Sequence, residues 1–174
     1  MDNENELLKI YKYGEDILKH SAREITDIDQ RIVDLVRRMA RTMYAAPGVG
    51  LAAPQVGESI RLFTVDISSG EDPAEFMALI NPKILETEGS EVEEEGCLSL
   101  PGEQMGVKRA TRILLSAITL DGKPIRQEFS GYKARALQHE YDHLDGILII
   151  DRISPLKRAL IRQDIQKKRK SGEW

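Results

Sequence analysis

The sequence predicts an α+β fold, in which helices and antiparallel strands occupy separate stretches of the chain. Three observations predict it. Apolar residues recur at helical spacing between residues 29 and 44. Short β-branched and apolar runs then follow from about residue 60 to residue 129. Two further helical segments come last, and this order differs from the strand–helix alternation that is typical of a parallel sheet.

The first helix is expected over residues 29 to 44, because its apolar side chains fall on one face of a helix. Pro47, Gly48 and Gly50 follow and should end it, since proline and glycine interrupt helices. We expect the apolar face to be buried. Its residues are Ile32, Leu35, Val36, Met39, Ala40 and Met43.

The strands are expected in the runs RLFTVDI, ALI and RILLSAITL. Asp121-Gly122 predicts a tight hairpin between ITL and KPIRQEF, because both residues tolerate the left-handed backbone of such turns. After Ser130, a helix N-cap, the segment GYKARALQHEYDHL predicts a second helix that stops before Gly146. Ser154-Pro155 predicts the start of a third helix, which runs to about residue 169.

Length and composition indicate one ordinary globular domain over residues 1–174. The chain has 174 residues, of which 41% are apolar and 31% charged, and it shows no repeat or long linker. The net charge of -4 argues against a dedicated nucleic-acid binder, so no DNA partner is expected. The opening MDNENELLKIYKYG lacks the features of a signal or transit peptide, and no run approaches the ~20 apolar residues of a membrane span. We therefore expect a bacterial, cytoplasmic protein without membrane contact.

Two charge clusters stand out, and a solvated surface is the usual explanation for each. One is acidic and leads into Cys97. It contains Glu86, Glu88, Glu91, Glu93, Glu94 and Glu95. The other is basic and lies in the third predicted helix. It contains Lys157, Arg158, Arg162, Lys167, Lys168, Arg169 and Lys170.

The strongest local motif is His139-Glu140-Tyr141-Asp142-His143. On a helix, residues four apart lie on the same face, so both imidazoles can reach one metal ion. Glu140 lies beside the first ligand, where a carboxylate can reach a water molecule held by the metal. The alternative is a surface helix that carries two histidines by chance. The motif predicts a metal site on the second helix.

Two histidines leave a catalytic site short of its usual third protein ligand. Cys97 is the only cysteine, so it cannot form an internal disulfide and is a buried thiol, a metal ligand or a nucleophile. Downstream of His143 the chain offers a few carboxylates and no further histidine. Cys97 is the better third ligand, because its thiolate binds soft and borderline metals strongly. A Cys/His/His site with an open fourth position follows.

The stretch GVGLAAPQ, residues 48 to 55, is a weaker signal. Glycine and alanine let a backbone approach a ligand closely, which suits the lining of a cleft. Taken alone, a helix cap followed by a loop is the simpler interpretation. A phosphate-binding loop does not fit, because no Lys-Ser/Thr follows at the required offset.

Taken together, GVGLAAPQ, EGCLS and HEYDH resemble the three signature stretches of the peptide deformylase family. The resemblance extends from the N-terminal helix through ITLDGKPI to DHLDGILIIDRIS and so covers most of the chain. It implies antiparallel β-sheets packed around a central metal-binding helix, with an N-terminal and a C-terminal helix. It also implies an enzyme that hydrolyses the N-formyl group from the formyl-methionine of nascent polypeptides and releases formate.

The resemblance assigns roles to individual residues. Cys97, His139 and His143 hold the metal, and Glu140 is the general acid/base that acts on the water bound there. Gln55 and the backbone N–H of Leu98 stabilise the developing oxyanion. Gly50 holds the extended substrate, Val49 lines the methionine pocket, and Gly96 also belongs to the substrate-binding residues. Arg135 is expected to be structural or to lie at the pocket rim.

The metal implied by the resemblance is Fe²⁺, often replaced by Zn²⁺, Ni²⁺ or Co²⁺ in purified protein, and the ligands alone do not select among these ions. The implied partners are N-formyl-methionyl nascent peptides. The ribosome is a further hypothesis, since a basic C-terminal helix could contact RNA phosphates. Two alternatives compete: a zincin-like endopeptidase, which shares the His-Glu-x-x-His helix, and a folded module with a structural metal, which normally has four protein ligands.

Overall fold

The computed structural model describes residues 6–174, so residues 1–5 of the expected domain lie outside the described part. Its α-helices are α1 (Gln30–Ala45), α2 (Gly131–Leu144) and α3 (Pro155–Lys170). Its short 3-10 helices are η1 (Asp16–Lys19), η2 (Ala53–Val56) and η3 (Ile149–Arg152). Its strands are β1 (Gly50–Ala52), β2 (Leu62–Val65), β3 (Met77–Glu88), β4 (Glu91–Cys97), β5 (Leu100–Arg109), β6 (Arg112–Ile118) and β7 (Pro124–Ser130).

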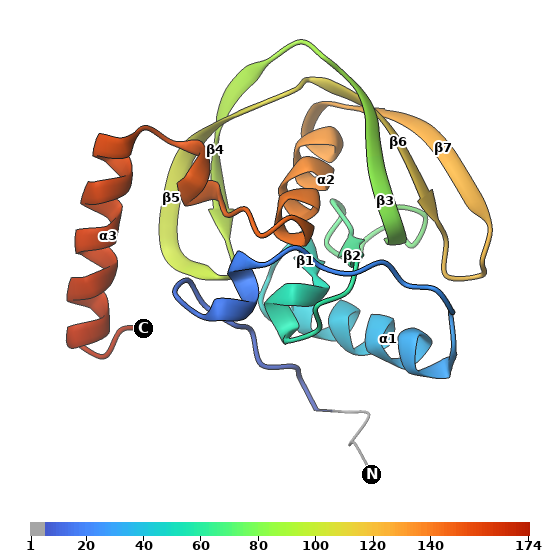
Figure 1. Cartoon of the computed structure of the whole chain (residues 1–174), viewed down its shortest axis with the longest axis horizontal. Helices are drawn as coiled ribbons and strands as arrows, with labels where there is room; N and C mark the ends of the chain where they lie inside the picture. Colours follow the sequence, from blue (N-terminus) through green and yellow to red (C-terminus); the bar gives the residue numbers. More distant parts are fainter. Residues whose placement is uncertain (1–5) are drawn as a thin grey trace.

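The strands form two antiparallel sheets. The larger has the order β1-β2-β3-β6-β7, and β4 and β5 form a separate two-stranded sheet. The long strand β3 pairs with β2 through its first residues and with β6 further along, with register shifts between them. The strands therefore bend over helix α2, which lies in the middle of the molecule (Figure 1). The predicted α+β fold with antiparallel sheets around a central helix is confirmed.

Helix α2 is held by the largest apolar cluster. Leu137 and Leu144 have no exposed surface, and they pack with Phe63, Val65 and Leu115 of the five-stranded sheet. Burying a leucine or phenylalanine side chain contributes about 1.5–3 kcal/mol, so this contact fixes the helix against the sheet. The predicted bounds of α2 agree with the structure, and Ser130 occupies the N-cap position, although its side chain makes no capping hydrogen bond.

Helix α1 supports the start of the larger sheet. The Asp29 side chain accepts a hydrogen bond from the Ile32 N–H at 3.0 Å and caps the helix. Apart from Ala40, the predicted apolar face is buried, and it packs in a second cluster with Leu51 and Ala53 of the next two elements. The stretch from Gly48 to Gln55, for which a loop was the simplest interpretation, instead contains β1 and most of η2.

The sheet of β4 and β5 was not predicted as a hairpin. Most of the acidic cluster on and before it is exposed, as expected, but Glu95 is only 8% exposed. The prediction of a solvated surface is wrong at this residue, because Glu95 points inward and pairs with buried cations. Glu95 contacts His139 and Arg109 there.

The segment before η1 joins η2 to the turn between β4 and β5. The backbone N–H of Tyr11 donates to the carbonyl of Gln55 at 2.7 Å, and that of Tyr13 donates to the carbonyl of Ser99 at 2.8 Å. The N-terminal segment therefore fixes η2 relative to the β4–β5 turn. Among the described helices, none is long and apolar enough to cross a membrane.

Candidate metal centre and cleft

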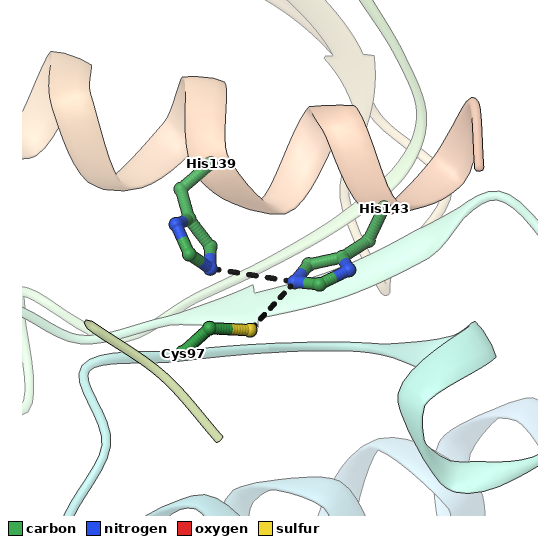
Figure 2. A group of neighbouring side chains, drawn as sticks. All are labelled: Cys97, His139 and His143. Atoms are coloured by element: carbon green, nitrogen blue, oxygen red, sulfur yellow. Dashed lines mark hydrogen bonds between the residues drawn. The ribbon is translucent and has the colours of Figure 1, made fainter. Parts of the chain in front are cut away.

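Three donor side chains converge at the centre of the molecule. His139 and His143 project from one face of α2, and Cys97 reaches them from the end of β4 (Figure 2). The Nε2 atoms of the two histidines are 3.3 Å apart, and His143 Nε2 is 3.5 Å from Cys97 Sγ. Within residues 6–174, these three form the group of His, Cys, Asp and Glu residues whose ligand atoms lie close enough to share an ion, all within 4.8 Å of one another.

The chemistry of this donor set fits a transition metal. Thiolate and imidazole ligands suit zinc and iron, and three protein donors leave a coordination position free. Burial and the nearby charge of His139 hold the pKa of His143 well below its usual range, which favours the neutral imidazole that binds metals. The two imidazoles and the thiol therefore converge, with their donor atoms within 4.8 Å of one another.

Glu95 orients the first histidine. Its Oε2 lies 2.9 Å from Nδ1 of His139, so a proton on Nδ1 leaves Nε2 free for the metal. Burial alone would raise the pKa of Glu95, but hydrogen bonds from His139 and Arg109 lower it to about 2. Glu95 is therefore an ionised carboxylate that fixes both the tautomer and the ring position of His139.

A buried charge network surrounds Glu95. Arg109 donates to both of its oxygens, at 2.9 and 3.0 Å, and Arg135 donates to Oε1 at 2.8 Å. Arg109 also contacts Asp142 of α2 at 2.5 Å, and Arg152 donates twice to the same carboxylate. The network joins β4, β5 and α2 with paired charges, which is how buried charges are tolerated in proteins.

Glu140 is a buried carboxylate beside the three donors. It is 4% exposed, and its Oε2 has no hydrogen-bond partner in the described structure. Oε1 lies 4.0 Å from His139 Nε2. Burial raises the pKa of Glu140 to about 7, against the opposing charge of His139. An unpaired buried oxygen is rare in folded proteins and is commonly explained by a functional role. This carboxylate is placed to accept a proton near the donors.

Gly50 makes room for Glu140. A Cβ built on Gly50 would lie 2.4 Å from Oε1 of Glu140 and 2.8 Å from its Cγ and Cδ, closer than real Cβ atoms approach. We expect Gly50→Ala to displace the Glu140 side chain and to lower the rate of the reaction described below by at least about 10²-fold, the contribution of one positioned acid/base. Metal content should stay near that of the parent, because Gly50 touches no metal donor.

Gly106→Ala is the matched control for Gly50→Ala, because Gly106 lies in a strand outside the cleft lining. A Cβ on Gly106 would meet its nearest neighbour, Cγ1 of the exposed Val92 side chain, at 3.3 Å, and that side chain can move aside. The two variants are compared by turnover and by metal analysis. Equal rates in the two variants would contradict the steric argument.

Gln55 is fixed at both ends of its side-chain amide. Its Oε1 accepts from the Ala52 N–H at 2.9 Å, and its Nε2 donates to Ser99 Oγ at 3.1 Å and lies 3.7 Å from Cys97 Sγ. Gln55 is 1% exposed. The amide N–H groups therefore point to the donor cluster and are held there without side-chain freedom.

A cleft of about 680 Å³ opens onto the donors. Each predicted site residue except His143 lines it, and His143 lies buried behind Cys97 and His139. Leu98 and Ser99 form the turn between β4 and β5, and Val49 leads into β1, so the cleft lies between these two segments. The cleft residues with predicted roles are Val49, Gly50, Gln55, Gly96, Cys97, Leu98, His139 and Glu140.

The residues that support the metal donors were not predicted from the sequence. Glu95 was grouped with surface acids, and Arg109 and Arg152 were not singled out. Arg135 lines the cleft and pairs with Glu95, so its expected structural position at the rim is confirmed. One signal could have found Glu95: it lies two residues before Cys97, and alternate residues of a strand share a face.

The fold and the three converging donors, with a buried carboxylate beside them in a cleft, define a metal-dependent hydrolase. The model of the family described as polypeptide deformylase matches residues 7–159. A peptide deformylase of Thermodesulfovibrio yellowstonii is 48% identical over 163 residues, which cover 94% of this chain and 99% of the relative. The chain belongs to the polypeptide deformylase family.

Solved structures agree with this assignment. A peptide deformylase from Legionella pneumophila superposes with a TM-score of 0.90 at 38% identity, covering 97% of this chain and 98% of that one. A peptide deformylase from Synechococcus elongatus, in complex with actinonin, gives a TM-score of 0.87 at 36% identity, covering 97% and 90%. The alternative of a zincin-like endopeptidase is not favoured, because the third donor precedes the histidine helix instead of following it.

Proposed function

We propose that this protein removes the formyl group from the N-terminal formyl-methionine of nascent polypeptides and releases formate. The observation that carries the proposal is the buried, unpaired carboxylate of Glu140 beside three convergent metal donors in a cleft. Membership of the polypeptide deformylase family supports the substrate class. An extended peptide end fits a cleft that opens between β1 and the β4–β5 turn.

The proposed metal ligands are Cys97, His139 and His143, and we propose Fe²⁺ as the ion of the working enzyme. Zn²⁺, Ni²⁺ or Co²⁺ can replace it in purified protein, since a thiolate and two imidazoles accept each of these ions. When bound, the metal supplies a Lewis acid that polarises the formyl carbonyl and makes water more acidic. Glu95 keeps Nε2 of His139 directed at the ion through the contact at Nδ1.

The remaining roles belong to residues of the cleft. Glu140 accepts a proton from the attacking water and passes it to the amine that leaves. The amide of Gln55 and the backbone N–H of Leu98 donate to the oxygen that gains charge, an effect of roughly 10²–10³-fold in rate for each such donor. Val49, Gly50 and Gly96 hold the methionyl residue against the cleft. The fixed orientation of Gln55 supports its role, because a donor that is already aimed needs no reorganisation.

Formate release from formyl-methionyl-alanyl-serine tests the proposal. The protein is purified without oxygen, and its metal is determined in the same sample, because an iron–thiolate site is sensitive to oxidation. Formate and free methionyl-alanyl-serine should appear in equal amounts. Absence of formate from a sample that carries one metal ion per chain would refute the proposed activity. Peptide-bond cleavage in unformylated peptides would then be assayed.

We also propose that the basic face of α3 contacts ribosomal RNA. Exposed Lys157, Lys167 and Lys170 support this, because phosphate contacts by lysine favour binding to RNA. Lys168 and Arg169 are poor choices for the test, since they contact Glu103 and Tyr13 of the same chain. Neutralising the three exposed lysines should weaken co-sedimentation with ribosomes and preserve peptide turnover. Unchanged co-sedimentation would exclude this surface.

We further propose that residues 1–174 form one catalytic domain that acts in the bacterial cytoplasm. Two observations support the first part: two of the core clusters share the strands β1, β2 and β3, and the network of Glu95, Arg109 and Asp142 joins β4 and β5 to α2. The second part is supported by bacterial relatives such as that of T. yellowstonii. Nascent formylated peptides emerge in that compartment.

A further inference from the structure

Residues of the C-terminal segment bind directly to one wall of the cleft. This wall consists of Pro101, Gly102 and Glu103, at the start of β5. The indole Nε1 of Trp174 donates to the carbonyl of Pro101 at 3.0 Å, and Lys168 of α3 forms an ion pair with Glu103. Figure 1 shows α3 beside β5, with the end of the chain turned back from the helix.

A second connection runs from α3 to the turn that carries Leu98 and Ser99. Arg169 donates to the carbonyl of Tyr13, and Arg162 donates to the Tyr13 hydroxyl at 3.0 Å. The backbone N–H of Tyr13 in turn donates to the carbonyl of Ser99 at 2.8 Å. Helix α3 and the residues after it thus support two segments of the cleft lining: the turn before Leu100, through Tyr13, and the wall from Pro101 to Glu103 after it.

The polar contacts of Trp174 and Lys168 add to the apolar packing that holds α3 in place. Ile165 is 1% exposed and lies in the same apolar cluster as Leu100 and Ile150, so it anchors the helix. Trp174 is only partly buried, and it borders a second cavity of about 340 Å³ on the surface. The guanidinium of Arg169 lies over its ring at 5.2 Å. Trp174 also packs against this cluster from its edge, so Trp174→Phe, which keeps a ring there, retains more of the packing of α3 than Trp174→Ala.

These polar contacts differ from those of the reacting groups. In the described part of the chain, the Pro101 carbonyl accepts from Trp174, and the Glu103 carboxylate accepts from Lys168. Cys97 instead contacts Gln55 and His143, and His139 contacts Glu95. Glu103 is 8% exposed, so Lys168 neutralises a carboxylate that would otherwise be unpaired in the wall. Among the described residues, the Pro101 carbonyl and the Glu103 carboxylate therefore line the cleft through polar contacts that are separate from those of the metal donors.

We propose that Trp174 and Lys168 are positioning residues that hold the wall from Pro101 to Glu103 in place, and so set the affinity for the peptide residues that follow the formyl-methionine. The proposal rests on the deformylase function given above. It predicts an effect on KM and none on the chemical step, because neither residue reaches the metal donors or Glu140.

Steady-state kinetics with formyl-methionyl-alanyl-serine test the proposal in Trp174→Phe, Trp174→Ala and Lys168→Ala. Loss of one hydrogen bond or ion pair to the wall should raise KM by about three- to tenfold. The value of kcat should stay within about twofold of the parent. Phenylalanine keeps a ring beside Arg169 and lacks the N–H donor, so Trp174→Phe should show most of the increase. Lys168→Arg should restore the parental KM, and Lys157→Ala at the other end of α3 is the control.

Fluorescence gives a readout that does not depend on turnover. Trp174 is the only tryptophan, so tryptophan emission comes from the one indole that contacts the wall. Titration with the product peptide methionyl-alanyl-serine should change this emission saturably, with weaker binding in Lys168→Ala. Unchanged KM in all three variants, unchanged emission on binding, or a parallel loss of kcat and metal would overturn the proposal. A parent protein that releases no formate would instead refute the deformylase function, and the titration would still test the wall.

Discussion

Glu140→Gln should lower the rate of formate release by about 10²–10⁴-fold, and the variant should still bind one metal ion per chain. The substitution keeps the size of the side chain against Gly50 and removes its charge and its ability to accept a proton. Glu140 lies next to the donors and has a free oxygen, so no other group need move for it to act. The measurement is the rate constant of formate release under single-turnover conditions, with the metal content determined in both proteins.

Glu91→Gln is the matched control for Glu140→Gln. Glu91 is an exposed carboxylate at the start of β4, outside the cleft lining. Its variant should keep the parental rate, which would show that the loss does not follow from a lower negative charge alone. A Glu140→Gln protein with full metal content and parental turnover would exclude Glu140 as the acid/base.

The elements with regular apolar patterns could be predicted from the sequence. Helix α2 combines an N-cap serine with a continuous helical segment before Gly146, and its predicted ends agree with the structure. The β6–β7 hairpin followed from Asp121-Gly122 and two β-branched runs. In these elements the local preference of the residues and the tertiary packing favour the same structure, so the sequence pattern is sufficient.

The β4–β5 sheet lacks such a pattern for a physical reason. Alternate residues of β5 are buried, but two of these positions hold Glu103 and Arg109 in place of apolar side chains. Glu95 fills a buried position of β4 in the same way. Paired charges in the interior remove the apolar alternation that identifies a strand. Which carboxylate pairs with which arginine depends on the folded arrangement of β4, β5 and α2.

The convergence of Cys97, His139 and His143 was predictable because the chemistry of these residue types is specific. Only a few residue types bind transition metals, and a lone cysteine with two histidines one helical turn apart leaves little choice. The groups that orient the ligands were not predictable in the same way. Carboxylates and guanidinium groups are common on surfaces, so Glu95 and Arg109 are distinguished only by their burial and by their contact with His139 and Asp142.

Glu95→Ala should destabilise the protein by about 3–5 kcal/mol, because it leaves buried cations without their partner. Arg109 would keep Asp142, but Arg135 would lose its contact at 2.8 Å with a carboxylate of the interior. The same change frees the Nδ1 side of His139, and loss of such a contact typically weakens metal binding by about 10–100-fold. Urea unfolding gives the stability, and competition with a chelator gives the metal affinity.

Glu95→Gln separates the two effects of Glu95. The amide retains an oxygen that can accept from His139 or from one arginine, but it carries no charge to balance both guanidinium groups. We expect a smaller loss of metal affinity than in Glu95→Ala, together with a clear loss of stability. Glu91→Ala, an exposed change on the same strand, should alter neither quantity. If Glu95→Ala keeps parental stability and metal affinity, Glu95 does not link the charge network to the metal centre, and the orientation of His139 must depend on packing within α2 alone.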